Sequence, residues 1–248
     1  MNVLVVGAGQ MGRWLGASID ADVAFADVDP EVAQDAATTL DARAVALDAG
    51  GTFDAVCFAV PMPTVEAAIA EYANRGERAV FDVTGVMGPP VRAMREHAPD
   101  RERVSLHPLF APDAEPGTIA VVSDAPGPTV DAILEALADA GNDLVETTPE
   151  EHDDAMATVQ AGAHAAIMAY AIQAADVPEH FRTPVSEGLE DLASRVLNGN
   201  PDVYADIQAT FDGADAIATA ARGIADADRE NVAELYREAS RRWRDRDD

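Results

Sequence analysis

The sequence predicts an α/β protein in which a Rossmann-type, mostly parallel sheet domain precedes an all-helical domain. In the first half, short runs of apolar and β-branched residues alternate with amphipathic stretches, a pattern typical of buried strands joined by helical crossovers. The chain opens with one such run, followed directly by a glycine-rich turn. After residue 147 the strand patterns stop, and helical patterns continue to the charged end of the chain. We therefore expect domains at residues 1–147 and 148–248.

The expected elements follow from these patterns. The second domain begins at Thr148-Pro149-Glu150-Glu151, where a threonine N-cap, a proline at the first helical position and a glutamate three residues after the cap form a capping box. A long helix is expected from there to Asp176, with further helices at Val185–Leu197, Pro201–Arg222 and Arg229–Arg242. Strands of the first domain are expected at Val3–Val6, Val23–Ala26, Ala55–Ala59, Ala79–Val83, Val104–Leu106, Ile119–Ser123 and Leu144–Glu146.

The charge pattern argues against two classes of partner. The chain has 45 acidic and 17 basic residues, all of the basic ones arginine, and a net charge of −28. Such a chain is not expected to bind nucleic acid or an anionic membrane. The acids are scattered rather than gathered into a tail, and molar salt would screen their mutual repulsion. We interpret this surface as the adaptation of a halophile to a salt-loaded cytoplasm.

The chain is expected to be soluble and cytoplasmic. Its first residues, MNVLVVGAGQ, lack the basic segment of a signal peptide. No apolar run approaches the roughly 18 residues that a membrane span needs. The single cysteine, Cys57, lies inside an apolar run and is expected to be a buried, inert thiol.

A dinucleotide site is predicted at the start of the chain, where residues 7–12 read GAGQMG directly after a strand. Gly7 would allow the tight turn, Gly9 the approach of a pyrophosphate, and Gly12 close packing of helix on strand. Asp27 ends the second expected strand, 20 residues after Gly7, where a carboxylate can accept hydrogen bonds from the ribose of NAD and would repel the 2′-phosphate of NADP. The alternative is a glycine-rich turn without a ligand.

The segment SLHPLFAPD, residues 105–113, raises a second question about function. It is expected to end a strand and to place His107 on a turn braced by Pro108 and Pro112. The histidine could cap a backbone group of the turn. It could instead be a general base at the carboxyl end of the sheet, since the unperturbed pKa of histidine is about 6.5 and a base must be held within about 3 Å of its proton.

Collinear blocks over residues 2 to about 207 resemble the prephenate dehydrogenases, most closely the dehydrogenase half of bacterial enzymes fused to chorismate mutase. One block alone could arise by chance, but this order and spacing argue for common descent. The blocks are the glycine turn with Gln10, Met11 and Arg13, Ala59-Val60-Pro61, Asp82-Val83-Thr84-Gly85 with Gly88-Pro89, SLHPLFAPD, Glu151-His152-Asp153, Met156-Ala157, Gln160-Ala161, His164, Arg195 and Asn200–Ile207.

The resemblance implies NAD-dependent oxidative decarboxylation of prephenate to 4-hydroxyphenylpyruvate in tyrosine biosynthesis, by a homodimer formed through the helical domain. It assigns His107 as the catalytic histidine and Arg195 as the arginine that grips a substrate carboxylate, a role suited to its guanidinium fork. Gln160 and His164, four residues apart on one helix, would lie beside the substrate. The implied cofactor residues are Gly7, Gly9, Gln10, Met11, Gly12, Asp27, Val60 and Pro61.

The chain departs from the family in the loop after the fourth expected strand. Many members carry serine and then lysine where this chain has Gly85 and Met87. Thr84 or a water would have to take over the serine hydroxyl's part at the substrate. His152 is interpreted as a capping or interface residue, and its spacing from His164 does not suit a metal pair, so no metal is predicted.

Two other functions remain open from the sequence. Arogenate dehydrogenase acts on a substrate that differs only in an amine replacing the side-chain ketone. A non-catalytic NAD(H)-binding sensor would share the fold. A β-hydroxyacid dehydrogenase is disfavoured, because it would need a lysine on the long helix and the chain has no lysine.

Overall fold

The computed structural model describes residues 1–111 and 114–245. The chain divides into two compact units, Met1–Ala155 and Met156–Asp248. Pro112 and Asp113 lie outside the described residues, so the predicted bracing of His107 by Pro112 stays a prediction. The domain boundary proposed near residue 147 is likewise still a prediction.

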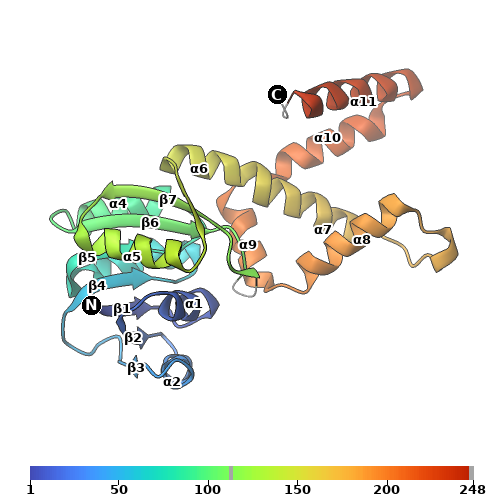
Figure 1. Cartoon of the computed structure of the whole chain (residues 1–248). Helices are drawn as coiled ribbons and strands as arrows, with labels where there is room; N and C mark the ends of the chain where they lie inside the picture. The colour runs from blue at the N-terminus through green and yellow to red at the C-terminus, as the bar shows by residue number, and fades with distance from the viewer. Residues whose placement is uncertain (112–113, 246–248) are drawn as a thin grey trace. The chain divides into compact units, whose positions relative to one another are not determined.

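The first unit is built on one eight-stranded sheet with the order β3-β2-β1-β4-β5-β6-β7-β8 (Figure 1). All neighbouring strands are parallel except β6 and β7, which are antiparallel. The order reverses between β1 and β4, the point at which open α/β sheets bind ligands. The strands are β1 (Asn2–Val6), β2 (Asp22–Ala26), β3 (Arg43–Ala44), β4 (Phe53–Phe58), β5 (Gly76–Asp82), β6 (Glu102–Pro108), β7 (Thr118–Ala125) and β8 (Asp143–Glu146).

Helices cover both faces of this sheet, which confirms the predicted Rossmann-type class. One apolar core lies under α1 (Gln10–Ser18), α2 (Pro30–Thr39) and α5 (Pro128–Asp139). The other lies under α3 (Val65–Tyr72) and α4 (Gly88–His97). The short turns η1 (Met62–Thr64) and η2 (Ala73–Arg75) flank α3. Strands covered on both faces can be apolar throughout, and β1 and β4 are nearly so.

Strand β6 is longer than predicted and changes the setting of His107. It continues through His107 and Pro108, because β7 pairs with it as far as the register Pro108 with Ile119. The expected turn at His107 is therefore wrong. The histidine belongs to a strand and is held by sheet pairing, with its side chain 7% exposed.

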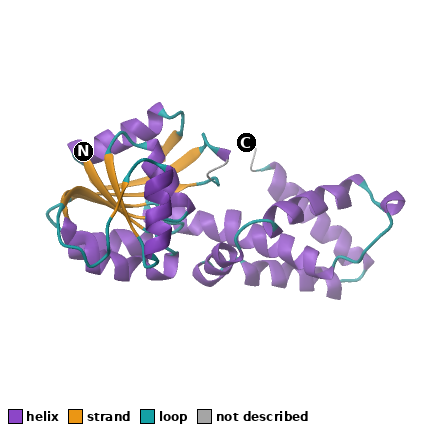
Figure 2. Ribbon diagram, turned by 90° about the horizontal axis from the view of Figure 1, so that it is seen from below, coloured by secondary structure: helices purple, strands orange, loops and turns teal. Residues whose placement is uncertain are grey.

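The second unit is helical throughout its described part, as predicted (Figure 2). Thr148 does cap the first helix, since its Oγ1 accepts a hydrogen bond from Glu151 N at 3.1 Å. The helices are α6 (Pro149–Met156), which spans the division between the units, a π-helical segment η4 (Ala157–Gly162), α7 (Ala163–Gln173), η5 (Glu179–Phe181), α8 (Pro184–Leu197), α9 (Pro201–Thr210), α10 (Ala214–Asp226) and α11 (Arg229–Arg244).

The prediction of a single helix over Pro201–Arg222 is wrong, because α9 ends at Thr210 and α10 begins at Ala214. Phe211 turns into the core of the unit at 6% exposure. Gly213 meets the π-helical segment so closely that a Cβ there would lie 2.2 Å from Ala157 O and 2.3 Å from Gly162 N. This approach of backbone to backbone needs both the glycine and the bend. Asn200 caps α9, accepting from Asp202 N at 3.0 Å.

Candidate active site

The carboxyl ends of β1, β2, β4, β5 and β6 meet at one edge of the sheet, because these strands are parallel to one another. The glycine turn follows β1, Asp27 follows β2, and Val60 and Pro61 come shortly after β4. Asp82 ends β5, and His107 lies near the end of β6. The topology therefore gathers the predicted cofactor residues and the predicted base at a single edge of the first unit.

The three glycines of the turn are required for different reasons, which follow from the space around each of them. Gly7 has φ +98°, and a Cβ there would lie 2.3 Å from Ala59 O. A Cβ on Gly12 would lie 2.0 Å from Gly7 O. A Cβ on Gly9, by contrast, would meet nothing within 4 Å. The fold itself requires Gly7 and Gly12, whereas at Gly9 the described residues leave open space in front of the first turn of α1.

Backbone amides of the glycine turn and of the residues after β2 hold the carboxylate of Asp27 in place. Its Oδ2 accepts from Ala8 N at 2.7 Å, and its Oδ1 accepts from Asp29 N at 3.0 Å. Each carboxylate oxygen can accept more than one hydrogen bond, so these contacts fix the group without saturating it. Arg13 is engaged by Asp35 through an ion pair of 2.6 Å. Arg13 also contacts the turn, because its Nε donates to Ala8 O at 2.9 Å.

A chain of hydrogen bonds leads from His107 into α6. His107 Nδ1 lies 2.8 Å from His152 Nε2, and His152 Nδ1 lies 2.8 Å from Asp153 Oδ1. The two carboxylate oxygens of Asp153 accept from Met87 N at 3.0 Å and Gly88 N at 2.9 Å. Asp153 thereby binds the amino end of α4, where the helix dipole favours an anion. We name the three side chains the His107–His152–Asp153 relay.

The directions of these bonds follow from what each group can donate. Partial burial disfavours an ionised Asp153, but hydrogen bonds from His152 and the two backbone amides hold its pKa below the usual value. The carboxylate only accepts, so His152 donates its Nδ1–H. When its ring is neutral, His152 Nε2 accepts the Nδ1–H of His107. The remaining nitrogen, His107 Nε2, then carries no proton and is the acceptor.

His107 is not tuned to titrate near neutrality, which was the expectation for a free-standing base. Burial and the neighbouring His152 lower its pKa to about 3, although Asp153 acts in the opposite direction. The ring is therefore neutral at physiological pH. A proton accepted at Nε2 is not stable on His107 alone, and the relay to His152 becomes part of its chemistry.

The departures at residues 85 and 87 lie directly at this relay. A Cβ on Gly85 would stand 3.6 Å from His107 Nε2 and 3.2 Å from Met62 Sδ. Residue 85 therefore borders the accepting nitrogen, although it brings no side chain to it. Met87 binds Asp153 through its backbone, while its side chain is fully buried in the core beneath α4.

Thr84 does not face a substrate. It is 4% exposed, and its Oγ1 lies 2.6 Å from Asp82 Oδ1 and 3.0 Å from Val86 O. The hydroxyl is committed within the protein. The predicted substrate contact of Thr84 is accordingly replaced by a role in holding its own loop.

The second unit holds the other predicted substrate residues. Gln160 lies in the π-helical segment, a local irregularity that is frequent at functional sites. His164 follows in α7, where burial lowers its pKa and its ring meets Tyr204 edge-on at 4.9 Å between centroids. Arg195 is exposed in the last turn of α8. Tyr204 thus packs against His164.

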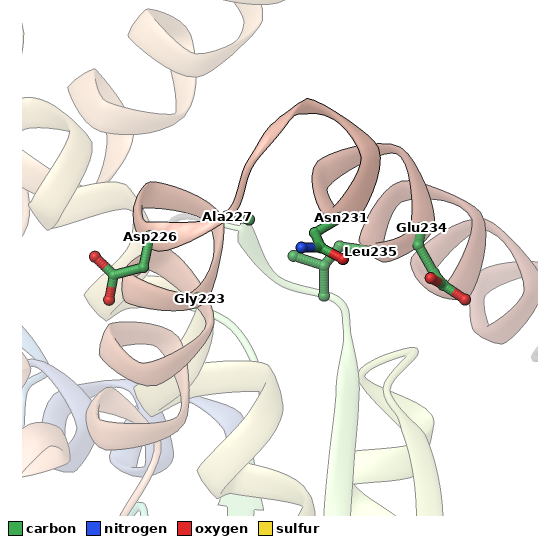
Figure 3. Close-up of a pocket in the computed structure, with 6 residues that line it drawn as sticks. All are labelled: Gly223, Asp226, Ala227, Asn231, Glu234 and Leu235. Atoms are coloured by element: carbon green, nitrogen blue, oxygen red, sulfur yellow. The ribbon is translucent and has the colours of Figure 1, made fainter.

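An open pocket lies between α10 and α11 (Figure 3). It holds none of the predicted catalytic or cofactor residues and has no cluster of groups suited to chemistry. Its lining consists of Gly223, Asp226, Ala227, Asn231, Glu234 and Leu235.

Comparison with known proteins identifies the family. Residues 12–123 match the nucleotide-binding domain of prephenate dehydrogenase, and residues 148–238 match its dimerization domain. The chain belongs to the prephenate dehydrogenase family. The predicted membership of this family is confirmed, and the protein is placed among the dehydrogenases.

Members of this family that are similar to the chain differ in their named substrates. The 4-amino-4-deoxyprephenate dehydrogenase of Streptomyces pristinaespiralis is 32% identical over 234 residues, which are 86% of this chain and 78% of the relative. The structure of A. aeolicus prephenate dehydrogenase with hydroxyphenyl propionate and NAD+ has a TM-score of 0.70 at 19% identity and covers 98% of both chains. Synechocystis arogenate dehydrogenase has a TM-score of 0.63 at 17% identity, covering 100% of this chain and 99% of the other. These two structures share the fold.

Two residues of the His107–His152–Asp153 relay were missed from the sequence. His152 was interpreted as a capping or interface residue, and Asp153 received no role. The structure corrects this, since His152 is 3% exposed and contacts His107 directly. The available signal was a histidine and an aspartate together in the first turns of a helix, within a block that already matched the family.

Proposed function

We propose that this protein catalyses the NAD-dependent oxidative decarboxylation of prephenate to 4-hydroxyphenylpyruvate in the tyrosine pathway of a salt-adapted cytoplasm. The observation that carries the proposal is the His107–His152–Asp153 relay, which ends in an accepting nitrogen at the carboxyl edge of a nucleotide-binding sheet. Membership of the prephenate dehydrogenase family supports it.

The glycine turn fits a dinucleotide. At Gly9 the space in front of the backbone is open, so a pyrophosphate can approach the first amides of α1, together with Gln10 and Met11. Asp27 is held in place to accept the ribose hydroxyls. Val60 and Pro61 adjoin the turn, since Val60 Cγ1 would lie 3.2 Å from a Cβ on Gly7. Bound NAD would supply the acceptor for the hydride that leaves substrate C4.

The relay gives the reaction its base. His107 Nε2 accepts the proton of the substrate's C4 hydroxyl, and its own Nδ1 proton passes to His152 Nε2. The positive charge then rests on His152, beside the carboxylate of Asp153. Because an imidazolium at buried His107 is unfavourable, this transfer makes the pair a stronger base than His107 alone. Loss of the proton assists departure of the C4 hydride and of the ring carboxylate as CO2, and the proton returns from the relay to the C4 oxygen as the ring becomes aromatic.

The substrate's charges call for a cation in this acidic chain. We assign Arg195 to a substrate carboxylate, with Gln160 and His164 as further contacts from the second unit. Arogenate, with an amine in the side chain, and 4-amino-4-deoxyprephenate, with an amine at C4, are the alternative substrates suggested by similar proteins. His107 Nε2, as an acceptor, can bind a hydroxyl or an amine at C4.

The test is NADH formation, followed by absorbance, in molar KCl with prephenate, arogenate or 4-amino-4-deoxyprephenate. A rate that requires prephenate and NAD supports the proposal. A faster rate with either amine would reassign the substrate within the family. Intact NAD binding without turnover of any of the three would leave a non-catalytic NAD(H) sensor.

Asp27 is predicted to set the preference for NAD over NADP. Replacement by asparagine should raise the ratio of kcat/KM for NADP to that for NAD by about tenfold or more, because a carboxylate beside the 2′-phosphate costs several kcal/mol at an effective dielectric constant of about 20. The asparagine oxygen can still accept from Ala8 N. The exposed Asp20→Asn variant is the control for one lost charge, and an unchanged ratio in Asp27→Asn would refute the assignment.

Asp153 is predicted to support His107 through His152. Asp153→Asn should lower kcat by about 10²–10⁴-fold, the range lost when the carboxylate behind a catalytic histidine is neutralised, because the charge on His152 loses its counter-ion. NAD affinity should change little. The adjacent, exposed Asp154→Asn variant carries the same charge change outside the relay. Equal kcat in the two variants would contradict the relay.

We also propose a homodimer formed by the helical region. The match to the dimerization domain covers residues 148–238. The most apolar 18-residue window of the continuous helix Pro149–Gln173 has a mean hydropathy of 1.2, and 17% of that window is buried, so by length and composition the helix could cross a membrane. Apolar side chains of α10 and α11 are also exposed, including Ile224 at 57% and Tyr236 at 75%. A second copy of the chain accounts for both observations without a membrane.

A further inference from the structure

Asp82 is a fully buried carboxyl group for which the proposed reaction has no use. It ends β5 at 0% exposure, with Phe58 of β4 and Ser105 of β6 as its neighbours in register. A buried carboxylate is unfavourable unless its oxygens are hydrogen-bonded. Asp82 Oδ2 and Ser105 Oγ have no hydrogen bond of ordinary geometry to any described residue. The group is therefore satisfied on one oxygen only.

If Asp82 is ionised, the Thr84 hydroxyl faces two acceptors but has only one proton to donate. Thr84 Oγ1 lies 2.6 Å from Asp82 Oδ1 and 3.0 Å from Val86 O, and Thr84 N donates to the same Asp82 oxygen at 3.0 Å. A hydroxyl has one proton. With an ionised Asp82 that proton can go to only one of the two oxygens. With a protonated Asp82, the acid donates to Thr84 Oγ1, and Thr84 donates to Val86 O.

This small network lies one step behind the relay. The two residues after Val86 are Met87 and Gly88, whose backbone amides bind Asp153. Gly85, between Thr84 and Val86, borders His107 Nε2. We propose that Asp82 is a positioning residue that works as a neutral acid, fixing the loop of residues 83–88 and through it the His107–His152–Asp153 relay. Its link to catalysis rests on the proposed function.

The electrostatic setting agrees with this geometry. Burial raises the pKa of Asp82 to about 7, against the opposing hydrogen bonds of Thr84 and the hydroxyl of Ser105, and the negative charge of Asp153 adds to the rise. Cys57 on β4, which pairs with Phe81 next to Asp82, is the other buried titratable group nearby, and burial raises the pKa of its thiol well above 9.0 and keeps it neutral. The folded chain thus binds a proton that the unfolded chain releases near the ordinary pKa of 3.8. Stability from this group is present at acid pH and is lost as pH rises through about 7.

The test begins with infrared spectra, which detect a protonated carboxyl directly and do not depend on activity. The difference between wild type and Asp82→Asn should contain a carboxylic acid carbonyl band that disappears as pH rises through about 7. The exposed Asp100→Asn variant should show no such band. Absence of the band at pH 6 would overturn the proposal.

Kinetics test the link to the relay. From pH 6 to 8.5 the kcat/KM of wild type should fall by about three- to tenfold relative to Asp82→Asn, whose amide stays neutral. The Tm of wild type should fall relative to the variant over the same range. Parallel kinetic profiles together with a titrating band would overturn the positioning role. A titrating band in a wild type without turnover would refute the proposed function and leave the neutral Asp82 in place.

Discussion

Replacing His107 by asparagine is expected to lower kcat for the oxidation of prephenate by about 10³-fold or more, within the range for loss of a general base. Asparagine can still donate a hydrogen bond from its amide towards His152 Nε2, so the buried partner need not be orphaned. It cannot accept and hold a proton. NAD binding should be retained, because the predicted cofactor residues of the glycine turn and Asp27 follow β1 and β2, whereas His107 lies on β6.

The measurement is kcat and KM for prephenate in molar KCl, with NAD affinity measured separately by titration. His97→Asn is the matched control, because His97 is exposed at the end of α4 and outside the relay. A kcat of His107→Asn within tenfold of wild type, with unaltered folding, would show that another group takes the proton. In that case the 2.8 Å contact between His107 and His152 would be structural only.

The sequence predicted those parts of the site that depend on local pattern. The glycine turn and Asp27 each follow a strand and His107 lies near the end of one, and these strands can be predicted from their apolar runs. Parallel strands then bring their carboxyl ends to one edge. The relay could not be predicted in this way. His107 and His152 are 45 residues apart, and their contact exists only after α6 has packed beside the end of β6. Spacing along the chain carries no information about such a pair.

The predictions that the structure contradicts failed for the same reason. Strand β6 runs past the predicted turn because β7 pairs with it, an interaction that outweighs the turn preference of Pro108. The break between α9 and α10 reflects close packing of Gly213 on the π-helical segment. His107 was expected to titrate near neutrality because a free imidazole does, and burial moves its pKa to about 3. In each case tertiary contacts decide against the local signal.

Replacing each of the three glycines of the turn by alanine should affect different properties, stability at Gly7 and Gly12 and NAD affinity at Gly9. Gly7→Ala introduces a Cβ 2.3 Å from Ala59 O at φ +98°, and Gly12→Ala introduces one 2.0 Å from Gly7 O. Real Cβ atoms do not approach backbone oxygens so closely, so the turn or the helix must move. We expect a loss of about 3 kcal/mol or more in the free energy of unfolding for each variant, the scale of overpacking combined with backbone strain. Denaturant unfolding at fixed salt measures it.

Gly9→Ala is the control that separates the fold from the ligand. Its Cβ meets nothing within 4 Å, and Gly9 has φ −70°, which alanine adopts without strain. The free energy of unfolding should stay within about 1 kcal/mol of wild type, as for surface changes that touch nothing. NAD affinity should fall by about tenfold or more, because the added methyl group occupies the path of the pyrophosphate to the backbone. If Gly9→Ala bound NAD as tightly as wild type, the dinucleotide would have to lie elsewhere. If instead Gly9→Ala lost as much stability as Gly7→Ala, the fold itself would require a glycine at residue 9, and the variant would give no information about a ligand.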